Sequence, residues 1–156
     1  MPVQPHQAIE VFYSYAHEDE KLRDKLENHL TLLRRQGVIT GWHDRKIGAG
    51  KEWHSEIDTH LDSSQIILLL ISANFIASDY CWDVEVKRAM ERHEAKEATV
   101  IPIILDSVDW ESAPFGRIQA LPKDAKPVKK WRNHNDAFLS VAQGIRIAIK
   151  DLIENS

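Results

Sequence analysis

The sequence has little cysteine and no long apolar run. Cys81 is its only cysteine, so the chain can form no internal disulfide, and a reducing compartment suits it better than a secreted setting. The longest uninterrupted apolar run, from Ile66 to Ile71, is far shorter than the ~20 residues that span a bilayer. The first residues lack the charged and apolar stretches of a signal peptide. We therefore expect a cytoplasmic protein with no membrane partner.

An excess of positive charge is also lacking. The formal net charge is −4, from 20 basic and 24 acidic residues. The densest basic cluster, Lys129, Lys130 and Arg132, is interrupted by Trp131 and is more typical of a solvated loop than of a nucleic-acid surface. We expect no nucleic-acid partner.

Several catalytic and metal-binding signatures are missing. The eight histidines never form H-E-x-x-H or a Cys/His ligand spacing, so we expect no metal site. There is no G-x-G-x-x-G and no G-x-S-x-G. A phosphate-binding G-x-x-x-x-G-K-[ST] loop is excluded because Arg45 and Glu52 stand where glycine and a hydroxyl residue are needed. A phospho-receiver needs an aspartate after the third strand, where this chain has Ser72.

The composition is that of a globular domain. The chain is 43% hydrophobic and 28% charged over 156 residues, with no internal repeat or low-complexity segment. These values predict a single domain over residues 1–156, with an ordered core from about 8 to 153. Whether this domain is the N-terminal part of a larger protein is left open.

Apolar patterning predicts strands that alternate with helices. The expected strands are Ala8 to Tyr15, Val38 to Trp42, Ile66 to Ile71, Val100 to Leu105 and a short one near Pro127 to Trp131. The expected helices run from Asp19 to Gln36 with Gly37 closing it, from Trp53 to Leu61, from a cap at Ser72 or Ser78 to about Lys96, and from Phe138 to Leu152. This order predicts a flavodoxin-like α/β fold with a parallel five-stranded sheet and helices on both faces.

In such folds, ligands bind beyond the carboxyl ends of the strands, where the strand order reverses. Three segments are expected to converge there: 14–19, 44–52 and 72–85. Between them they carry aromatic rings, cationic side chains and the carboxylate of Glu85. This combination suits a ligand with flat rings and phosphates.

Four motifs in order resemble those of a Toll/interleukin-1 receptor (TIR) domain of the bacterial branch. They are Val11-Phe12-Tyr13-Ser14-Tyr15, the loop Trp42-His43-Asp44-Arg45-Lys46-Ile47-Gly48-Ala49-Gly50, the helix opening Ser78-Asp79-Tyr80-Cys81-Trp82-Asp83-Val84-Glu85, and the C-terminal Pro114-Phe115-Gly116, Leu121-Pro122 and Lys126-Pro127-Val128. The second motif resembles the family's BB loop. The resemblance covers nearly the whole chain and implies a TIR fold.

The resemblance implies one of two functions. Many bacterial and plant TIR domains cleave NAD+ at the nicotinamide–ribose bond, whereas many animal TIR domains only scaffold signalling complexes. Family catalysis rests on one glutamate in the third-helix motif, and Glu85 occupies that place. The family's cysteine stands three residues before the glutamate, but Cys81 stands four before it, which leaves open whether Tyr80 or Trp82 lines the site.

The chemistry of the reaction supports the assignment of Glu85 as the catalytic residue. Nicotinamide leaves readily as a neutral group, so the reaction needs a carboxylate near the ribose to hold its hydroxyls and stabilise an oxocarbenium-like centre. Without the motif, an acidic residue favoured near a helix N-terminus is the simpler interpretation. The expected substrate-binding residues are Ser14, Tyr15, Arg45, Lys46, Ile47, Trp53, Tyr80 and Trp82.

Several of these residues have a structural alternative. Arg45 and Lys46 could bind the pyrophosphate or serve contacts between TIR domains. Trp53 could stack on a base or pack against the sheet, and Trp82 could be a ring-stacking wall or a core anchor.

The resemblance therefore predicts an NAD+ nucleosidase that yields nicotinamide with ADP-ribose or a cyclic isomer. We expect it to be activated by self-assembly through the BB loop, in bacterial immune signalling such as antiphage defence. NAD+ is expected as the substrate, with no further cofactor. The alternative is a non-catalytic TIR–TIR interaction module.

Overall fold

The computed structural model describes residues 8–42 and 49–155. Its strands are β1 (Ile9–Ser14), β2 (Ile39–Trp42), β3 (Ile66–Ile71) and β4 (Thr99–Ile104). Its helices are η1 (His17–Asp19), α1 (Glu20–His29), α2 (Thr31–Arg35), α3 (Trp53–Ser63), α4 (Ala73–Ala77), the π-helix η3 (Cys81–Val86), α5 (Lys87–Glu94), η4 (Lys123–Ala125), η5 (Val128–Lys130) and α6 (His134–Glu154).

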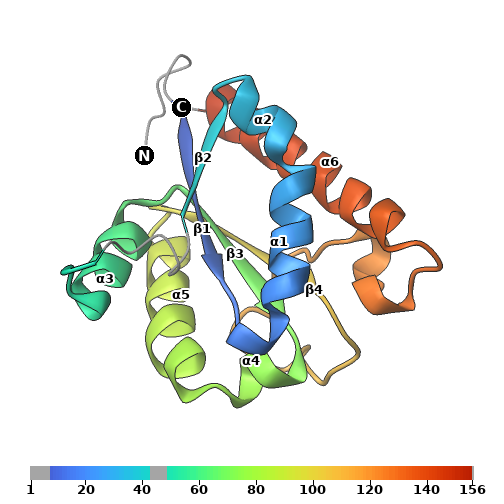
Figure 1. Cartoon of the computed structure of the whole chain (residues 1–156), viewed down its shortest axis with the longest axis horizontal. Helices are drawn as coiled ribbons and strands as arrows, with labels where there is room; N and C mark the ends of the chain where they lie inside the picture. Colours follow the sequence, from blue (N-terminus) through green and yellow to red (C-terminus); the bar gives the residue numbers. More distant parts are fainter. Residues whose placement is uncertain (1–7, 43–48, 156) are drawn as a thin grey trace.

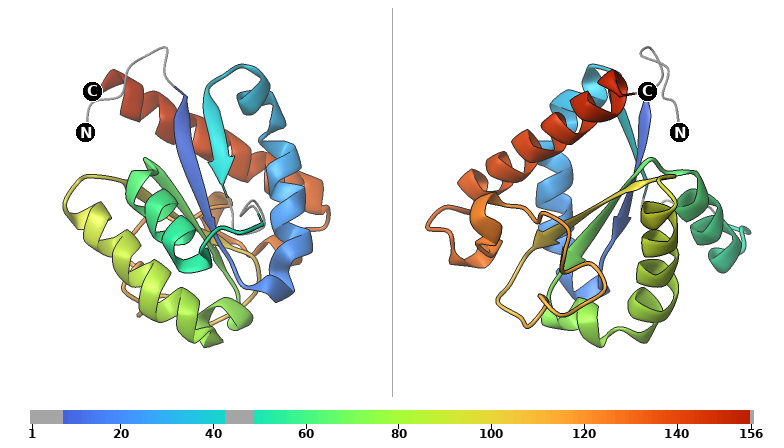
Figure 2. Two further views of the ribbon diagram at one scale, coloured as in Figure 1. Left: turned by 60° about the vertical axis from the view of Figure 1, so that its left-hand side comes forward. Right: turned by 180° about the vertical axis from the view of Figure 1, so that it is seen from behind.

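The strands form one parallel sheet in the order β2-β1-β3-β4. Val11 of β1 pairs with Gly41 of β2 on one side and with Ile66 of β3 on the other. The chain therefore reverses its direction of winding between β1 and β3, as in flavodoxin-like folds. Helices α1, α2 and α6 cover one face of the sheet, and α3 and α5 cover the other (Figures 1 and 2). The predicted fold class is confirmed.

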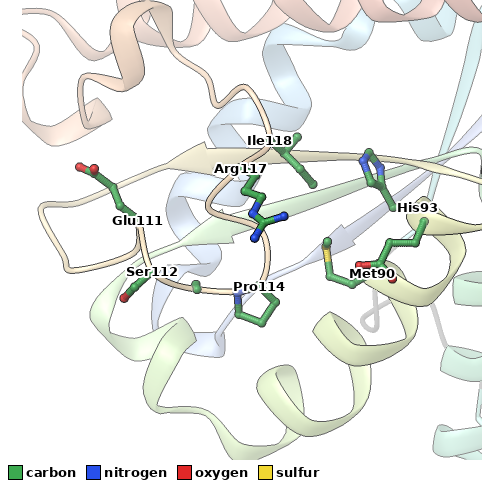
Figure 3. A pocket seen from close by; sticks show the side chains of 9 residues that line it. Met90, His93, Glu111, Ser112, Pro114, Arg117 and Ile118 are labelled. Atoms are coloured by element: carbon green, nitrogen blue, oxygen red, sulfur yellow. The ribbon is translucent and has the colours of Figure 1, made fainter.

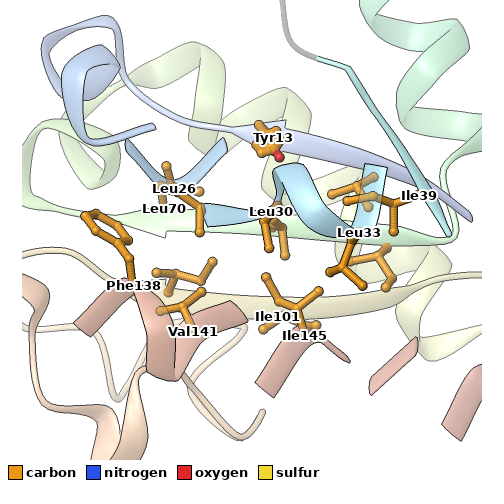
Figure 4. Close-up of a cluster of buried hydrophobic side chains, with 14 of the residues drawn as sticks. Tyr13, Leu26, Leu30, Leu33, Ile39, Leu70, Ile101, Phe138, Val141 and Ile145 are labelled. Atoms are coloured by element: carbon orange, nitrogen blue, oxygen red, sulfur yellow. The ribbon is translucent and has the colours of Figure 1, made fainter. Parts of the chain in front are cut away.

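Each face of the sheet has its own apolar core. One core joins Tyr13 and Leu70 to Leu26 of α1, to Leu30 at the junction of α1 and α2, and to Val141 of α6 (Figure 4). The other packs alternate residues of the same strands against α3, α4 and α5, and includes Phe12, Ile57 and Phe75. All residues of β3 are buried, as an unbroken apolar strand covered on both faces should be.

The fifth strand predicted near Pro127 to Trp131 is wrong. The sheet has four strands in the described part of the chain, and residues 128–130 form the 3₁₀ turn η5. Leu121 makes a single parallel bridge with Ile103 of β4. Pro122 and Pro127 have no N–H to donate, so the ladder does not extend along this segment. Pro102 lies on the edge strand β4, where a residue without a backbone N–H is easiest to accommodate.

Two predicted helices are interrupted. The predicted helix from Asp19 to Gln36 divides at Leu30 into α1 and α2, and the turn at Gly37 has a positive φ of 71° with Val38 N donating to Leu33 O. The helix predicted to reach Lys96 is divided into α4, η3 and α5. Both proposed caps are used, since Ser72 accepts from Phe75 N and Ser78 accepts from Cys81 N. No helix in the described residues is long and apolar enough to cross a membrane.

Candidate functional site

A hollow of about 330 Å³ lies at the point where the strand order reverses. Its walls come from the segments that follow β1 and β3 and from the start of α3. The lining residues are Tyr15, Ala16, His17, Glu18, Trp53, Asn74, Ala77, Ser78, Tyr80 and Cys81. This is the position at which open parallel sheets bind ligands, and we refer to this hollow as the switch-point pocket.

Aromatic rings form one wall of the switch-point pocket. The rings of Trp53 and Tyr80 lie 4.8 Å apart at 45°, and the ring of His54 lies 5.8 Å from Tyr80. Trp53 is 40% exposed, so it does not serve as a core anchor of the sheet. Across the pocket, the ring of Tyr15 meets His17 edge-on at 6.1 Å. Such a wall can stack against a flat heterocycle.

Glu85 lies next to this pocket and is hydrogen-bonded to the end of β1. The hydroxyl of Ser14 donates to Oε1 of Glu85 over 2.6 Å, and the two residues are 0% and 7% exposed. The thiol of Cys81 donates to the carbonyl oxygen of Tyr15 over 3.5 Å. Helix η3 is thus attached at two points to the strand end that precedes the pocket wall.

A π-helix carries Glu85. Residues 81–86 form i→i+5 hydrogen bonds in place of the i→i+4 bonds of an α-helix. A π turn accommodates one extra residue, and this chain has one extra residue between Cys81 and Glu85 compared with the TIR spacing described above. Short π segments recur at functional sites. The unusual spacing in the sequence therefore has a structural counterpart.

Tyr80 and Trp82 point to different sides of this segment. Tyr80 lines the switch-point pocket, whereas Trp82 packs edge-on against Phe115 at 6.0 Å. Trp82 also lines a separate hollow of about 520 Å³ that includes Met90 and Pro114. Residues two positions apart in a helix are separated by roughly 200° around its axis, so the side chains of Tyr80 and Trp82 point in nearly opposite directions. Trp82 is not among the residues that line the switch-point pocket, and the sequence had left open which of the two residues does.

A second chain of hydrogen bonds fixes the α4 wall. The hydroxyl of Ser72 donates to Oδ2 of Asp19 and accepts from the backbone N–H of Phe75 over 3.0 Å. Asp19 is 4% exposed. Burial raises the pKa of Asp19, and the hydrogen bond from Ser72 partly offsets this effect. Through this link the segment after β1 holds the start of α4, which supplies Asn74 to the pocket.

Three of the predicted binding residues, Arg45, Lys46 and Ile47, lie outside the described residues. Of the others, Tyr15, Trp53 and Tyr80 line the switch-point pocket, and Ser14 lies beside it through its bond to Glu85. The sequence prediction missed Asn74, Ala77 and Ser78, although they follow β3 and their position beside the switch point was a usable signal. In the described residues, no group of three or more His, Cys, Asp and Glu could hold a metal ion.

A larger hollow of about 790 Å³ lies along α5 (Figure 3). It is bounded by Met90, His93 and Glu94 and by the 111–118 segment, from which Arg117 points inward. None of its lining residues comes from the ends of β1 or β3. Glu85 is not among the residues that line either hollow, but its hydrogen bond to Ser14 attaches it to the end of β1, where the switch-point pocket begins. The switch-point pocket is therefore the better candidate site despite its smaller volume.

Comparison of the sequence with protein-family profiles identifies the family of the chain. The profile of the TIR domain matches residues 11–138, which include all four strands except the first residues of β1. The chain belongs to the TIR domain family.

Among relatives, this TIR domain is 58% identical over 138 residues to the uncharacterized protein y4lF of Sinorhizobium fredii. That match covers 88% of the chain but only 43% of y4lF, so the chain spans less than half the length of this relative. The relative is bacterial, which agrees with the bacterial branch predicted from the motifs.

Solved TIR structures have the same fold. The TIR domain of the Toll-related receptor TRR-2 from Hydra magnipapillata superposes with a TM-score of 0.63 at 19% identity, covering 90% of this chain and 97% of the other. The TIR domains of the activated Roq1 resistosome, which recognises the pathogen effector XopQ, superpose with a TM-score of 0.55 at 19% identity. That superposition covers 94% of this chain and 82% of the Roq1 chain. At such identity these likenesses concern the fold alone.

Proposed function

We propose that this TIR domain cleaves NAD+ at the bond between nicotinamide and ribose, with Glu85 as the catalytic carboxylate. The observation that carries the proposal is the Ser14–Glu85 hydrogen bond of 2.6 Å beside the aromatic pocket at the strand switch point. A carboxylate that served only the helix dipole would be exposed at the helix surface, but Glu85 is 7% exposed and held by a buried hydroxyl.

The proposed chemistry needs one carboxylate and no general acid. The C1′–N bond breaks with its electron pair passing to the nicotinamide nitrogen, which loses its positive charge and leaves as a neutral molecule. Glu85 holds the ribose hydroxyls and stabilises the positive charge that develops at C1′. Water then attacks C1′ and loses a proton to give ADP-ribose, or an adenine nitrogen attacks to give a cyclic isomer. No cofactor beyond the substrate enters this scheme.

The pocket supports the binding of one flat ring of the dinucleotide. Its volume of about 330 Å³ suits a ring and its ribose better than a whole dinucleotide. Tyr15, Trp53 and Tyr80 supply the stacking surfaces. Ser14 orients Glu85, and Trp82 has no contact with the ligand in this scheme. Arg45, Lys46 and Ile47 are proposed as the pyrophosphate-binding segment on their sequence alone.

We further propose that self-assembly activates the enzyme, in cytoplasmic immune signalling of a bacterium. The low exposure of Glu85, 7% in the single chain, supports this, because a ribose can reach the carboxylate only after the pocket wall shifts. A neighbouring copy, engaged through the BB loop, could supply that shift. The Roq1 structure is named as an activated resistosome, which is a precedent for TIR domains in an assembly.

The rival proposal is an interaction module without turnover. It rests on three large apolar side chains that are at least half exposed: Leu32 of α2 at 58%, and Leu139 and Ile147 of α6 at 50% and 64%. An interaction surface accounts for these residues. It does not account for the buried pair of Ser14 and Glu85.

The two proposals separate in one assay. The protein is incubated with NAD+ at high concentration or on a crowding surface, assembly is verified by light scattering, and nicotinamide release is quantified by chromatography. The enzyme proposal requires nicotinamide release by the assembled protein. Activation by self-assembly further requires that release rise more steeply than in proportion to the protein concentration. Assembled protein that releases no nicotinamide would leave the interaction module as the better account.

A further inference from the structure

Arg23 is a buried cation that neither the fold nor the proposed reaction explains. It lies on α1 and its side chain is 0% exposed, which makes it the largest fully buried side chain in the described residues. An arginine keeps its positive charge in proteins, and burying a charge is costly unless it is paired. Some feature of its surroundings must therefore hold it in place.

Two carboxylates bind part of the guanidinium group. Nη1 donates to Oε2 of Glu27 over 3.0 Å, and Nη2 pairs with Oδ1 of Asp24. These carboxylates are 21% and 43% exposed, so they pull the two outer nitrogens toward the surface. The Nε atom has no hydrogen-bond partner in the described part of the chain. The group is thus fixed at one side only.

The guanidinium group lies over two tyrosine rings. Its central carbon is 5.2 Å from the ring centroid of Tyr15 and 5.8 Å from that of Tyr13. Both distances are within the ~6 Å at which a cation is attracted to an aromatic face. Burial strengthens that attraction because water does not screen it. Tyr15 lines the switch-point pocket.

We propose that Arg23 is a positioning residue that holds the Tyr15 ring in the wall of the switch-point pocket. The inference that this wall binds NAD+ rests on the proposed function, but the positioning of the ring does not. Arg23 makes no contact with the ligand in this scheme. It acts through Tyr15, whose carbonyl oxygen is also bound by the thiol of Cys81.

The direct test follows the tyrosine rings by NMR. The chain has three tyrosines, Tyr13, Tyr15 and Tyr80, so ring-labelled tyrosine gives a spectrum that single Tyr→Phe variants can assign. In Arg23→Met, the Tyr15 ring signals are expected to shift and broaden while those of Tyr80 stay in place. Unchanged Tyr15 signals in the folded variant would overturn the proposal, whether or not the protein cleaves NAD+.

Stability separates positioning from a structural role. Removing one partner of a buried ion pair is costly when the other charge stays buried. Asp24 and Glu27 are 43% and 21% exposed, so both carboxylates reach water once Arg23 is replaced. The free energy of unfolding of Arg23→Met should therefore stay close to that of the wild type. If Arg23→Met does not fold, Arg23→Gln replaces it, since glutamine keeps a polar side chain but removes the cation. Unchanged Tyr15 signals in that variant contradict the proposal equally.

Kinetics tests the link to the pocket. For Arg23→Met, KM for NAD+ should rise roughly five- to thirtyfold, as expected from the loss of a buried cation–π contact, with kcat changed less than twofold. In a Tyr15→Leu background, the same substitution should change KM less than twofold, because its target is gone. Independent, multiplying effects would show that Arg23 does not act through Tyr15. Absence of turnover in the wild type would instead refute the proposed function and leave the NMR result standing.

Discussion

The hydroxyl of Ser14 donates a hydrogen bond of 2.6 Å to Oε1 of Glu85, across 71 positions of sequence. Ser14 is the last residue of β1 and Glu85 is in the π-helix η3, so the bond ties a strand end to the helix that carries the proposed catalytic group. Both residues are buried, and a hydrogen bond to a charged group at such a site is both stronger and more costly to break than one in water.

Removing that hydroxyl should impair catalysis. In Ser14→Ala, Glu85 loses the donor that fixes its orientation, so nicotinamide release is expected to fall roughly tenfold or more. The free energy of unfolding should fall by about 1–3 kcal/mol because the buried Oε1 of Glu85 loses this hydrogen bond. Ser64→Ala is the matched control, since Ser64 is 0% exposed but its hydroxyl binds His60 O, far along α3. Equal losses of activity in the two variants would contradict the orienting role of Ser14.

Substitutions of Tyr80 and Trp82 should affect different properties of the protein, the first substrate binding and the second stability. Tyr80 lines the switch-point pocket, so Tyr80→Ala is expected to raise KM for NAD+ about tenfold with the loss of a stacking surface. Trp82 packs on Phe115, so Trp82→Ala should lower the melting temperature and leave KM within about twofold. Steady-state kinetics and thermal unfolding of both variants check this. A larger KM effect at Trp82 than at Tyr80 would place the site on the other side of η3.

Much of the fold follows from the sequence because its strands are strongly patterned. The apolar run from Ile66 to Ile71 could only be a strand covered on both faces, and it coincides with β3. Gly37 predicted the end of the helical segment, and in the structure it follows α2 with a positive φ of 71°. The predicted fifth strand failed because Pro122 and Pro127 cannot donate to a ladder and residues 128–130 close into the 3₁₀ turn η5.

The site was less predictable, for a physical reason. That the segments after β1 and β3 converge follows from sheet topology, which predicted Tyr15 and Tyr80 near the switch point. Glu85 was assigned from the resemblance to the TIR motif, since topology alone left it a helix-end carboxylate. The Ser14–Glu85 bond depends on the rotation of η3 about its axis, which a π turn alters and which periodicity cannot reveal. The one-residue shift of Cys81 was the only sequence signal of that turn. Arg23 was missed because an arginine on an amphipathic helix is normally expected to face solvent.

Arg92 is expected to be a structural cation. Its guanidinium donates to Leu61 O over 2.7 Å and to Ser64 O over 2.6 Å, which closes the end of α3 against α5. Arg92→Met would leave these carbonyls without a partner, so the free energy of unfolding should fall by about 3 kcal/mol or more. Urea denaturation measures it. A loss under about 1 kcal/mol would show that water replaces the guanidinium at no cost.

Asp19 should make stability depend on pH. Its pKa is raised in the folded state by burial, so the folded protein holds this proton more tightly than the unfolded chain. The stabilising contribution is full below the ordinary value of 3.8 and is lost as the pH rises through the folded value. The Asp19→Asn variant does not lose this stability as the pH rises, because its side chain does not ionise, and its amide oxygen can still accept the hydrogen bond from Ser72. The free energy of unfolding of the variant, relative to the wild type, should therefore increase from pH 4 to pH 7, and a constant difference would contradict this assignment.

The central claim is that Glu85 is the catalytic carboxylate of an NAD+-cleaving TIR domain. The most direct measurement compares nicotinamide release by wild type, Glu85→Gln and Asp83→Asn, under conditions in which all three assemble. Asp83 is an exposed carboxylate in the same π turn and serves as the matched control. We predict that Glu85→Gln loses at least ~100-fold in rate while Asp83→Asn stays within about twofold. Equal rates for wild type and Glu85→Gln would contradict the claim.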